Sequence, residues 1–186
     1  MIICFTVPAP PRDSDVLDRH LVGIASGDKE ALAALYGCTK SAIYGFALSI
    51  LKNAHDAEDV LQDVFLQVWH AAPTYQSQGK PMAWLLTLTR NLALSRIREQ
   101  GRAELLPQET MHTFAHLPAV TEEDRVTLAA LLSQLGDQER QIVMLHALTG
   151  WKHREIAALL ELPLSTVLSK YNRALKKLRL AWKEAD

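Results

Sequence analysis

The residues whose types and spacing most clearly indicate a function are cationic side chains near the C-terminus. Such side chains can bind an anionic partner electrostatically. Residues 168–183 include no acidic side chain. The basic side chains in this stretch are Lys170, Arg173, Lys176, Lys177, Arg179 and Lys183. A helix with one cationic side can enter the major groove of DNA and neutralise phosphates on either side of it. The alternative is a solvated helix whose basic end complements its own dipole.

Residue patterns typical of catalysis are missing from the sequence. It contains no paired carboxylates in an apolar setting, no glycine-rich phosphate loop, no HExxH and no nucleophile elbow. His112 and His116 form the only candidate metal pair, but nearby prolines favour a linker there. Cys4 and Cys38 have no CxxC partner, which favours a reducing compartment, and Cys38 is expected to be an ordinary buried thiol. We therefore expect a protein that is not an enzyme and holds no metal or cofactor.

The basic stretch belongs to a predicted helix-turn-helix within residues 150–180. Apolar residues recur at spacings of three and four in two segments, so each segment is expected to form a helix with one apolar face. Pro163 lies in the break between them and cannot continue the first helix. Ser165 and Thr166 are N-cap candidates for the second helix. A short helix, a tight turn and a second helix together form the predicted DNA-binding motif.

Bulk composition limits the possible functions. The chain has 186 residues, 48% hydrophobic and 22% charged, which is typical of a globular protein with one or two small domains. Its net charge of −1 means that nucleic-acid binding must come from local basic patches. No apolar run is long enough to cross a membrane. The start, MIICFTVPAPPRD, is a poor signal peptide, so residues 1–13 are expected to be a flexible tail of a cytoplasmic protein.

The N-terminal half is predicted to be a bundle of helices near residues 14–25, 29–51, 56–71 and 81–102. Asp28 is expected to cap the second helix, and Gly27 to end the first. The third helix is unusual because no Lys or Arg occurs in residues 53–79. Its polar side consists of Asp56, Glu58, Asp59, Gln62, Asp63 and Gln67. A face of one sign favours a basic partner surface, although chance and the helix dipole are alternative explanations.

A polar loop and a basic helix follow the acidic helix. Tyr75 lies in this loop, and the helix after it carries Arg90, Asn91, Arg96 and Arg98. An aromatic side chain beside arginines can bind single-stranded nucleic acid, with bases stacked on the ring and phosphates on the cations. Residues 101–121 have no sustained periodicity and are predicted to be a linker. A helix capped by Thr121 and another over residues 138–148 would then support the helix-turn-helix.

The whole pattern resembles one known family. DAEDVLQDVFLQVW, a polar loop and AWLLTLTRNLALSRIR resemble the core-binding and −10-reading domain of extracytoplasmic-function sigma factors. LGDQERQIVMLHALTGWKHREIAALLELPLSTVLSKYNRALKKLR resembles their −35-reading domain. The resemblance implies an all-α fold of two small helical domains, residues 14–100 and 122–186, joined by a flexible linker.

The resemblance also implies partners and residue roles. The partners are core RNA polymerase, through its β′ clamp helices and β flap, promoter DNA and an anti-sigma factor. Asp59, Gln62 and Asp63 match positions that face the clamp helices. The matches for the −10 element are Tyr75, Lys80 and Asn91 for base capture and Arg90, Arg96 and Arg98 for phosphates. The matches for the −35 element are Ser165, Thr166, Ser169, Lys170 and Arg173, and we place Lys177 with them.

The sequence departs from the family pattern in the helix-turn-helix. Glu161 occupies the turn position where the family usually has glycine. If that position has positive φ, glutamate costs about 1 kcal/mol more than glycine. Leu168 replaces a common lysine, which makes the DNA-facing surface less cationic. An alternative function is a helix-turn-helix repressor or activator whose N-terminal domain is a sensor or a dimerisation module.

Overall fold

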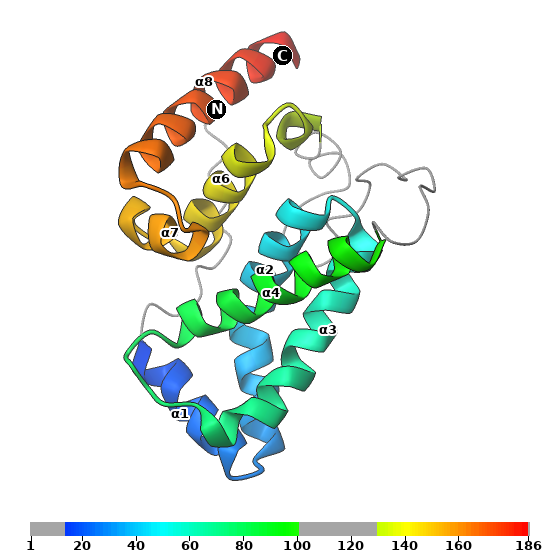
Figure 1. Ribbon diagram of the computed structural model, residues 1–186, viewed down its shortest axis with the longest axis vertical. Coiled ribbons are helices and arrows are strands. Elements are labelled where there is room, and N and C mark those ends of the chain that lie inside the picture. Colours follow the sequence, from blue (N-terminus) through cyan, green and yellow to red (C-terminus); the bar gives the residue numbers. More distant parts are fainter. Residues whose placement is uncertain (1–13, 101–129, 186) are drawn as a thin grey trace. The chain divides into compact units, whose positions relative to one another are not determined.

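A computed structural model describes residues 14–100 and 130–185 of the chain (Figure 1). The predicted tail, the linker, the helix capped by Thr121 and the His112–His116 pair lie outside the described residues. The chain separates into two compact units, one containing residues 14–100 and the other residues 130–185. Every regular element in these two ranges is helical, which confirms the all-α prediction.

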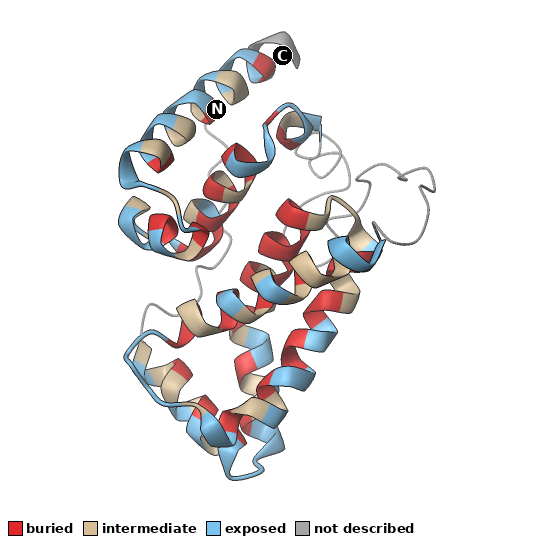
Figure 2. Cartoon of the chain, in the orientation of Figure 1, coloured by how far each residue is buried: buried red, intermediate tan, exposed pale blue. Residues whose placement is uncertain are grey.

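The N-terminal unit is a helical bundle built around α2. Its elements are α1 (Ser14–Ala25), α2 (Lys29–Leu51), α3 (Ala54–Ala71), the short 3-10 helix η1 (Ala72–Thr74) and α4 (Pro81–Gln100). α2 contacts α1, α3 and α4. Residues 42–50 of α2 are all buried, as the red segment of that helix shows (Figure 2). A helix that is buried all round is the core of its domain, so α2 fixes the positions of the other three helices.

Capping residues set the ends of these helices. The Asp28 carboxylate accepts hydrogen bonds from the amides of Glu30 and Ala31, which confirms it as the N-cap of α2. Gly27 has a φ of 84° in the turn before it. The Asn53 side chain accepts a hydrogen bond from the amide of Asp56, so α3 begins at Ala54, two residues before the predicted start.

The C-terminal unit places α8 (Leu164–Ala185) against α6 (Asp137–Thr149) and α7 (His153–Leu160). Its apolar centre includes the fully buried Ile142, Ile156 and Val167. Arg140 is also buried and donates hydrogen bonds to the carbonyl oxygens of Leu132 and Leu135. This arginine closes the turn before α6, a role that the sequence analysis did not predict.

In the turn between α7 and α8, Glu161 meets the condition under which glutamate is less favourable than glycine, and the predicted N-cap is corrected. Glu161 has φ 56° and ψ 41°, the left-handed conformation in which glycine is favoured. The N-cap prediction for Ser165 and Thr166 is wrong, because α8 begins at Leu164 and both residues lie in its first turn. The carbonyl oxygen of Pro163 accepts the amides of Thr166 and Val167 instead. Pro163 immediately precedes the first helical residue, and its backbone carbonyl, rather than a side chain, accepts these two amides.

Candidate polymerase-binding and DNA-binding surfaces

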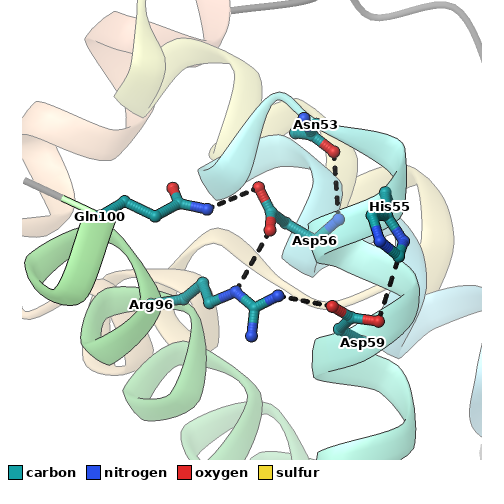
Figure 3. Close-up of polar contacts among 6 residues, drawn as sticks. All are labelled: Asn53, His55, Asp56, Asp59, Arg96 and Gln100. Carbon is teal, nitrogen blue, oxygen red and sulfur yellow. Dashed lines mark hydrogen bonds and ion pairs between the residues drawn. The ribbon is translucent and has the colours of Figure 1, made fainter. Parts of the chain in front are cut away.

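The acidic start of α3 is tied to the end of α4 by a group of polar contacts, which we call the α3–α4 clasp: Asp56, Asp59, Arg96 and Gln100 (Figure 3). Arg96 donates from Nε to Asp56 Oδ1 at 3.2 Å and from Nη2 to Asp59 Oδ2. Gln100 donates from Nε2 to Asp56 Oδ2 at 2.8 Å. Both oxygens of Asp56 are therefore bonded within the protein.

Burial and charge act in opposite directions on the Arg96 guanidinium of the clasp. The Asp56 side chain is only 13% exposed, whereas Asp59 and Arg96 are each 33% exposed. Burial lowers the pKa of Arg96, but the hydrogen bonds and charges of Asp56 and Asp59 outweigh it and leave the pKa raised. The predicted phosphate-binding Arg96 and the predicted polymerase-binding Asp59 are thus partners of each other.

The rest of the acidic face on α3 is open to solvent. Gln62 and Asp63 are exposed, and Leu66 beside them is 61% exposed. Asp59 also reaches the surface, where its second oxygen lies 3.8 Å from Nδ1 of the exposed His55. The carboxylates of Asp59 and Asp63 are therefore not enclosed in the core. A partner with basic side chains can reach Gln62 and Asp63 without disturbing the fold.

The loop between η1 and α4, residues 75–80, is fastened to α1. Tyr75 donates its hydroxyl to Asp18 Oδ1 at 2.7 Å, and Ser77 donates its hydroxyl to Asp18 Oδ2 at 2.7 Å. The Tyr75 ring packs against Trp84, with ring centroids 4.8 Å apart. Burial, and then the adjacent Asp18 carboxylate, raise the pKa of Tyr75, so its hydroxyl remains a donor. The predicted base-stacking side chain already has partners within the protein.

Asp18 was not predicted as a site residue, because in the sequence it is only an acidic residue near the start of a helix. Its partners lie 57 and 59 residues away, a distance over which helical periodicity carries no information. The only sequence signal for this contact was the pair of hydroxyl side chains at Tyr75 and Ser77, two positions apart in a short loop.

The basic side of α4 divides into engaged and accessible residues. Arg96 belongs to the clasp, and Arg90 is half-buried. Lys80, Asn91 and Arg98 are exposed. The Arg98 guanidinium lies along its own helix, donating from Nε to the Leu94 carbonyl oxygen at 3.1 Å. Of the residues predicted for the −10 element, these three remain open to a nucleic-acid strand.

On α8, one predicted DNA contact faces the protein instead. Lys177 donates from Nζ to Glu139 Oε2 at 2.7 Å, and Arg173 Nε lies 3.9 Å from Glu139 Oε1. Glu139 is 7% exposed and also accepts the amide of Gly136 at 3.2 Å. Burial raises the pKa of Glu139, but the bonds from Lys177 and the Gly136 amide outweigh it, so the pKa is lowered. Lys177 therefore fixes α8 to α6.

The first half of α8 presents neutral side chains to solvent. Ser165, Ser169 and Asn172 are exposed, Leu164 and Leu168 are 45% and 41% exposed, and Thr166 and Lys170 are half-buried. In a major groove, hydroxyl and amide groups can bond base edges and a leucine can contact a thymine methyl group. Lys170 and Arg173 supply the positive charge on this half of the helix, and Arg173 is exposed despite its ion pair with Glu139.

An aromatic cluster joins the three helices of this unit. The rings of His146 and His153 stack with centroids 5.1 Å apart, and both lie edge-on to Tyr171 of α8. His146 Nδ1 is 2.8 Å from the Trp151 carbonyl oxygen. His153 Nε2 is buried without a hydrogen-bond partner among the described residues. Burial, and then His146, lower the pKa of His153, so this ring packs as a neutral group.

Within residues 14–100 and 130–185, no group of three or more His, Cys, Asp or Glu side chains is arranged to hold a metal ion. None of the helices in these ranges is both long enough and apolar enough to cross a membrane.

These features define a two-domain helical protein with a helix-turn-helix, and comparison with known proteins gives its family. The Sigma-70 region 2 profile matches residues 35–103, and the Sigma-70 region 4 profile matches residues 125–178. The ECF RNA polymerase sigma factor SigK of Mycobacterium ulcerans (strain Agy99) is 32% identical over 91% of this chain and 95% of its own length. SigK of Mycobacterium tuberculosis (strain ATCC 25618 / H37Rv) is 33% identical over the same shares. The chain belongs to the extracytoplasmic-function sigma factors.

Two solved structures share the fold. CnrH in complex with the cytosolic domain of CnrY has a TM-score of 0.63 and 26% identity, covering 92% of this chain and 99% of that chain. The Bartonella quintana sigma factor RpoE, in complex with the anti-sigma factor NepR, has a TM-score of 0.61 and 23% identity, covering 76% and 90%. The second likeness concerns the fold alone.

Proposed function

We propose that this chain is a transcription initiation factor that binds core RNA polymerase and directs it to promoters with defined −35 and −10 elements. The observation that carries the proposal is the match to curated sigma factors over 91% of the chain, with both regions present in order. The protein acts in the cytoplasm and has no catalysis of its own: its contribution is differential binding of polymerase and of the two DNA elements.

The polymerase contact is assigned to the exposed part of the α3 face. Gln62 and Asp63 are open to solvent and Asp59 is partly so. A basic surface, such as the β′ clamp helices, would complement them. Asp59 has a second task in the clasp, so its replacement changes both the contact and the fold. The C-terminal unit is assigned to the β flap by resemblance to the family.

The −10 contact is assigned to the loop before α4 and to α4 itself. Lys80 and Asn91 are the accessible candidates for capture of an unstacked base. Arg90 and Arg98 are assigned to contacts with the phosphates of the strand. Melting then follows from binding, because a base held outside the stack stabilises the open form of the promoter. Tyr75 and Arg96 support this surface from within the protein.

The −35 contact is assigned to the first half of α8, with Ser165, Thr166 and Ser169 toward the bases. Lys170 and Arg173 provide the contacts with phosphates. Lys177 supports the helix from behind through Glu139. Because the exposed face of this half of α8 is largely neutral, we expect it to recognise base edges in the major groove partly through apolar and hydroxyl contacts.

Regulation by an anti-sigma factor is part of the proposal. RpoE of Bartonella quintana was solved in complex with an anti-sigma factor, and CnrH with the cytosolic domain of CnrY. A bound anti-sigma factor that covers the exposed α3 face would prevent polymerase binding by simple exclusion.

The test is transcription in vitro with core polymerase and a library of promoter sequences. The expected result is transcripts from a small set of templates that share two spaced elements, and none without the chain. Specific DNA binding by the chain alone, together with no complex with polymerase, would instead support the helix-turn-helix regulator.

A further inference from the structure

We propose that Asp18 is a positioning residue for promoter opening: it holds the loop of residues 75–80 in the shape that captures the unstacked base of the −10 element. The inference rests on the proposed function and adds to it a residue of α1, a helix that the base itself need not contact.

The geometry is a two-point attachment by one carboxylate. Asp18 Oδ1 accepts the Tyr75 hydroxyl and Oδ2 accepts the Ser77 hydroxyl, each at 2.7 Å. Hydrogen bonds to a carboxylate are shorter and stronger than neutral ones. Trp84, in the first turns of α4, holds the Tyr75 ring from another side. The loop is therefore fixed to α1 and to α4 in the free protein.

This attachment sorts the loop residues into two groups. Tyr75, which is half-buried, and Ser77, which is exposed, donate their hydroxyls to Asp18. Gln76, Gln78 and Lys80 are exposed and make no such bond to Asp18. The amides of the two glutamines carry both donors and acceptors, which suits them to the edge of an unpaired base. Tyr75 is accordingly a support for the loop rather than a stacking platform.

Fixing the loop in advance favours capture because ordering a chain segment costs conformational entropy. When the segment is already ordered, that entropic cost does not reduce the free energy of binding the base. Loss of the Asp18 attachment should therefore reduce promoter opening while leaving polymerase binding and −35 binding unchanged.

The test compares the variants Asp18→Ala and Tyr75→Phe with a matched control, Asp15→Ala. The control removes the same charge from the same helix and is exposed in the structure. We expect Asp18→Ala to lower the open-complex fraction, measured by permanganate reactivity of unpaired thymines, by at least about tenfold, because tenfold corresponds to one charge-assisted bond and this variant loses two. The control should open the promoter no less than the wild type, because removal of a negative charge by itself favours DNA binding.

Tyr75→Phe separates the two roles of the tyrosine. Phenylalanine keeps a ring that can stack on a base but cannot donate to Asp18. We expect a severalfold loss of opening, and we expect the double variant with Asp18→Ala to be no worse than Asp18→Ala alone. Wild-type opening by Tyr75→Phe, or losses that add in the double variant, would overturn the proposal.

A second measurement uses the free full-length protein and does not depend on polymerase. In nitrogen-15 relaxation experiments, the amides of Ser77 and Gly79 should show order parameters near those of rigid backbone in the wild type and in Asp15→Ala, and lower values in Asp18→Ala. A loop that stays rigid in Asp18→Ala overturns the attachment. A loosened loop with unchanged opening overturns its role in base capture, whereas a wild-type chain that never opens a promoter overturns the proposed function.

Discussion

Replacing Arg96 by methionine should destabilise the N-terminal unit by about 2 kcal/mol, because Arg96 links α3 to α4 within the protein and is not reserved for a DNA phosphate. Hydrogen bonds that involve a charged group contribute about 1.5–3 kcal/mol each. Arg96 makes such bonds to two carboxylates, but its side chain is 33% exposed and water screens part of the interaction. A total of about 2 kcal/mol remains after this discount.

The assay is native-state hydrogen exchange of the α3 and α4 amides in the full-length protein. Arg98→Met is the matched control, since it removes the same charge two positions along α4 from an exposed residue. An exposed substitution of this kind should change stability by less than about 0.5 kcal/mol. Equal protection in the two variants would refute the assignment of Arg96 to the clasp.

For DNA binding, the expected effects of the two substitutions are reversed: Arg98→Met should matter and Arg96→Met should not. Arg98→Met should reduce the slope of log affinity against log salt by about 1, because one phosphate contact is lost. Arg96→Met should leave this slope unchanged. If Arg96→Met reduces the salt dependence of DNA binding and leaves the stability of the N-terminal unit unchanged, Arg96 is a phosphate contact and the clasp does not stabilise the fold.

Three further predictions concern the C-terminal unit. Glu139→Gln and Lys177→Met should each destabilise it by about 1–2 kcal/mol, with a non-additive double variant in chemical denaturation, because both remove the ion pair between Glu139 and Lys177. Glu161→Gly should stabilise it by about 0.5–1 kcal/mol, measured as a higher denaturation midpoint, because the residue has positive φ. The pKa of His153 is lowered in the folded state, so the unfolded chain binds more protons, and stability should fall as the pH drops below about 6.5. His153→Gln should flatten that pH dependence, as followed by exchange of α6–α8 amides.

Local signals predicted the helices well. Asp28, Gly27 and the spacing of apolar residues define the boundaries of α1 and α2, since capping and amphipathicity act over a few residues. The left-handed conformation of Glu161 was considered only as a condition, on the ground that the family resembled by the sequence usually has glycine at this position. The N-cap of α8 was mistaken because the carbonyl of Pro163 performs the function that a serine or threonine side chain was expected to perform.

Long-range polar pairs could not be predicted in the same way. Arg96 with Asp59, Tyr75 with Asp18 and Lys177 with Glu139 each join residues more than thirty positions apart. Which of several cations on a helix faces a carboxylate depends on the packing angle between helices, and periodicity does not encode that angle. Charge counts therefore indicated candidate binding faces, whereas the fold determines which charges on those faces remain available.

The assignment of Gln62 and Asp63 to the polymerase contact can be tested without disturbing the clasp. Both residues are exposed, whereas Asp59 also bonds Arg96 and would confuse a loss of contact with a loss of fold. The double variant Gln62→Lys/Asp63→Lys reverses the sign of this surface. Glu30→Lys, exposed in the first turn of α2, is the control for added positive charge.

The most direct measurement is the affinity of the full-length chain for core RNA polymerase in the absence of DNA. We predict a stable complex for the wild type and for Glu30→Lys, and an affinity at least about tenfold weaker for Gln62→Lys/Asp63→Lys, because close like charges would oppose binding. Equal affinity of the double variant and the wild type would refute the assignment of Gln62 and Asp63 to the polymerase contact, and no complex with either would refute the proposed function.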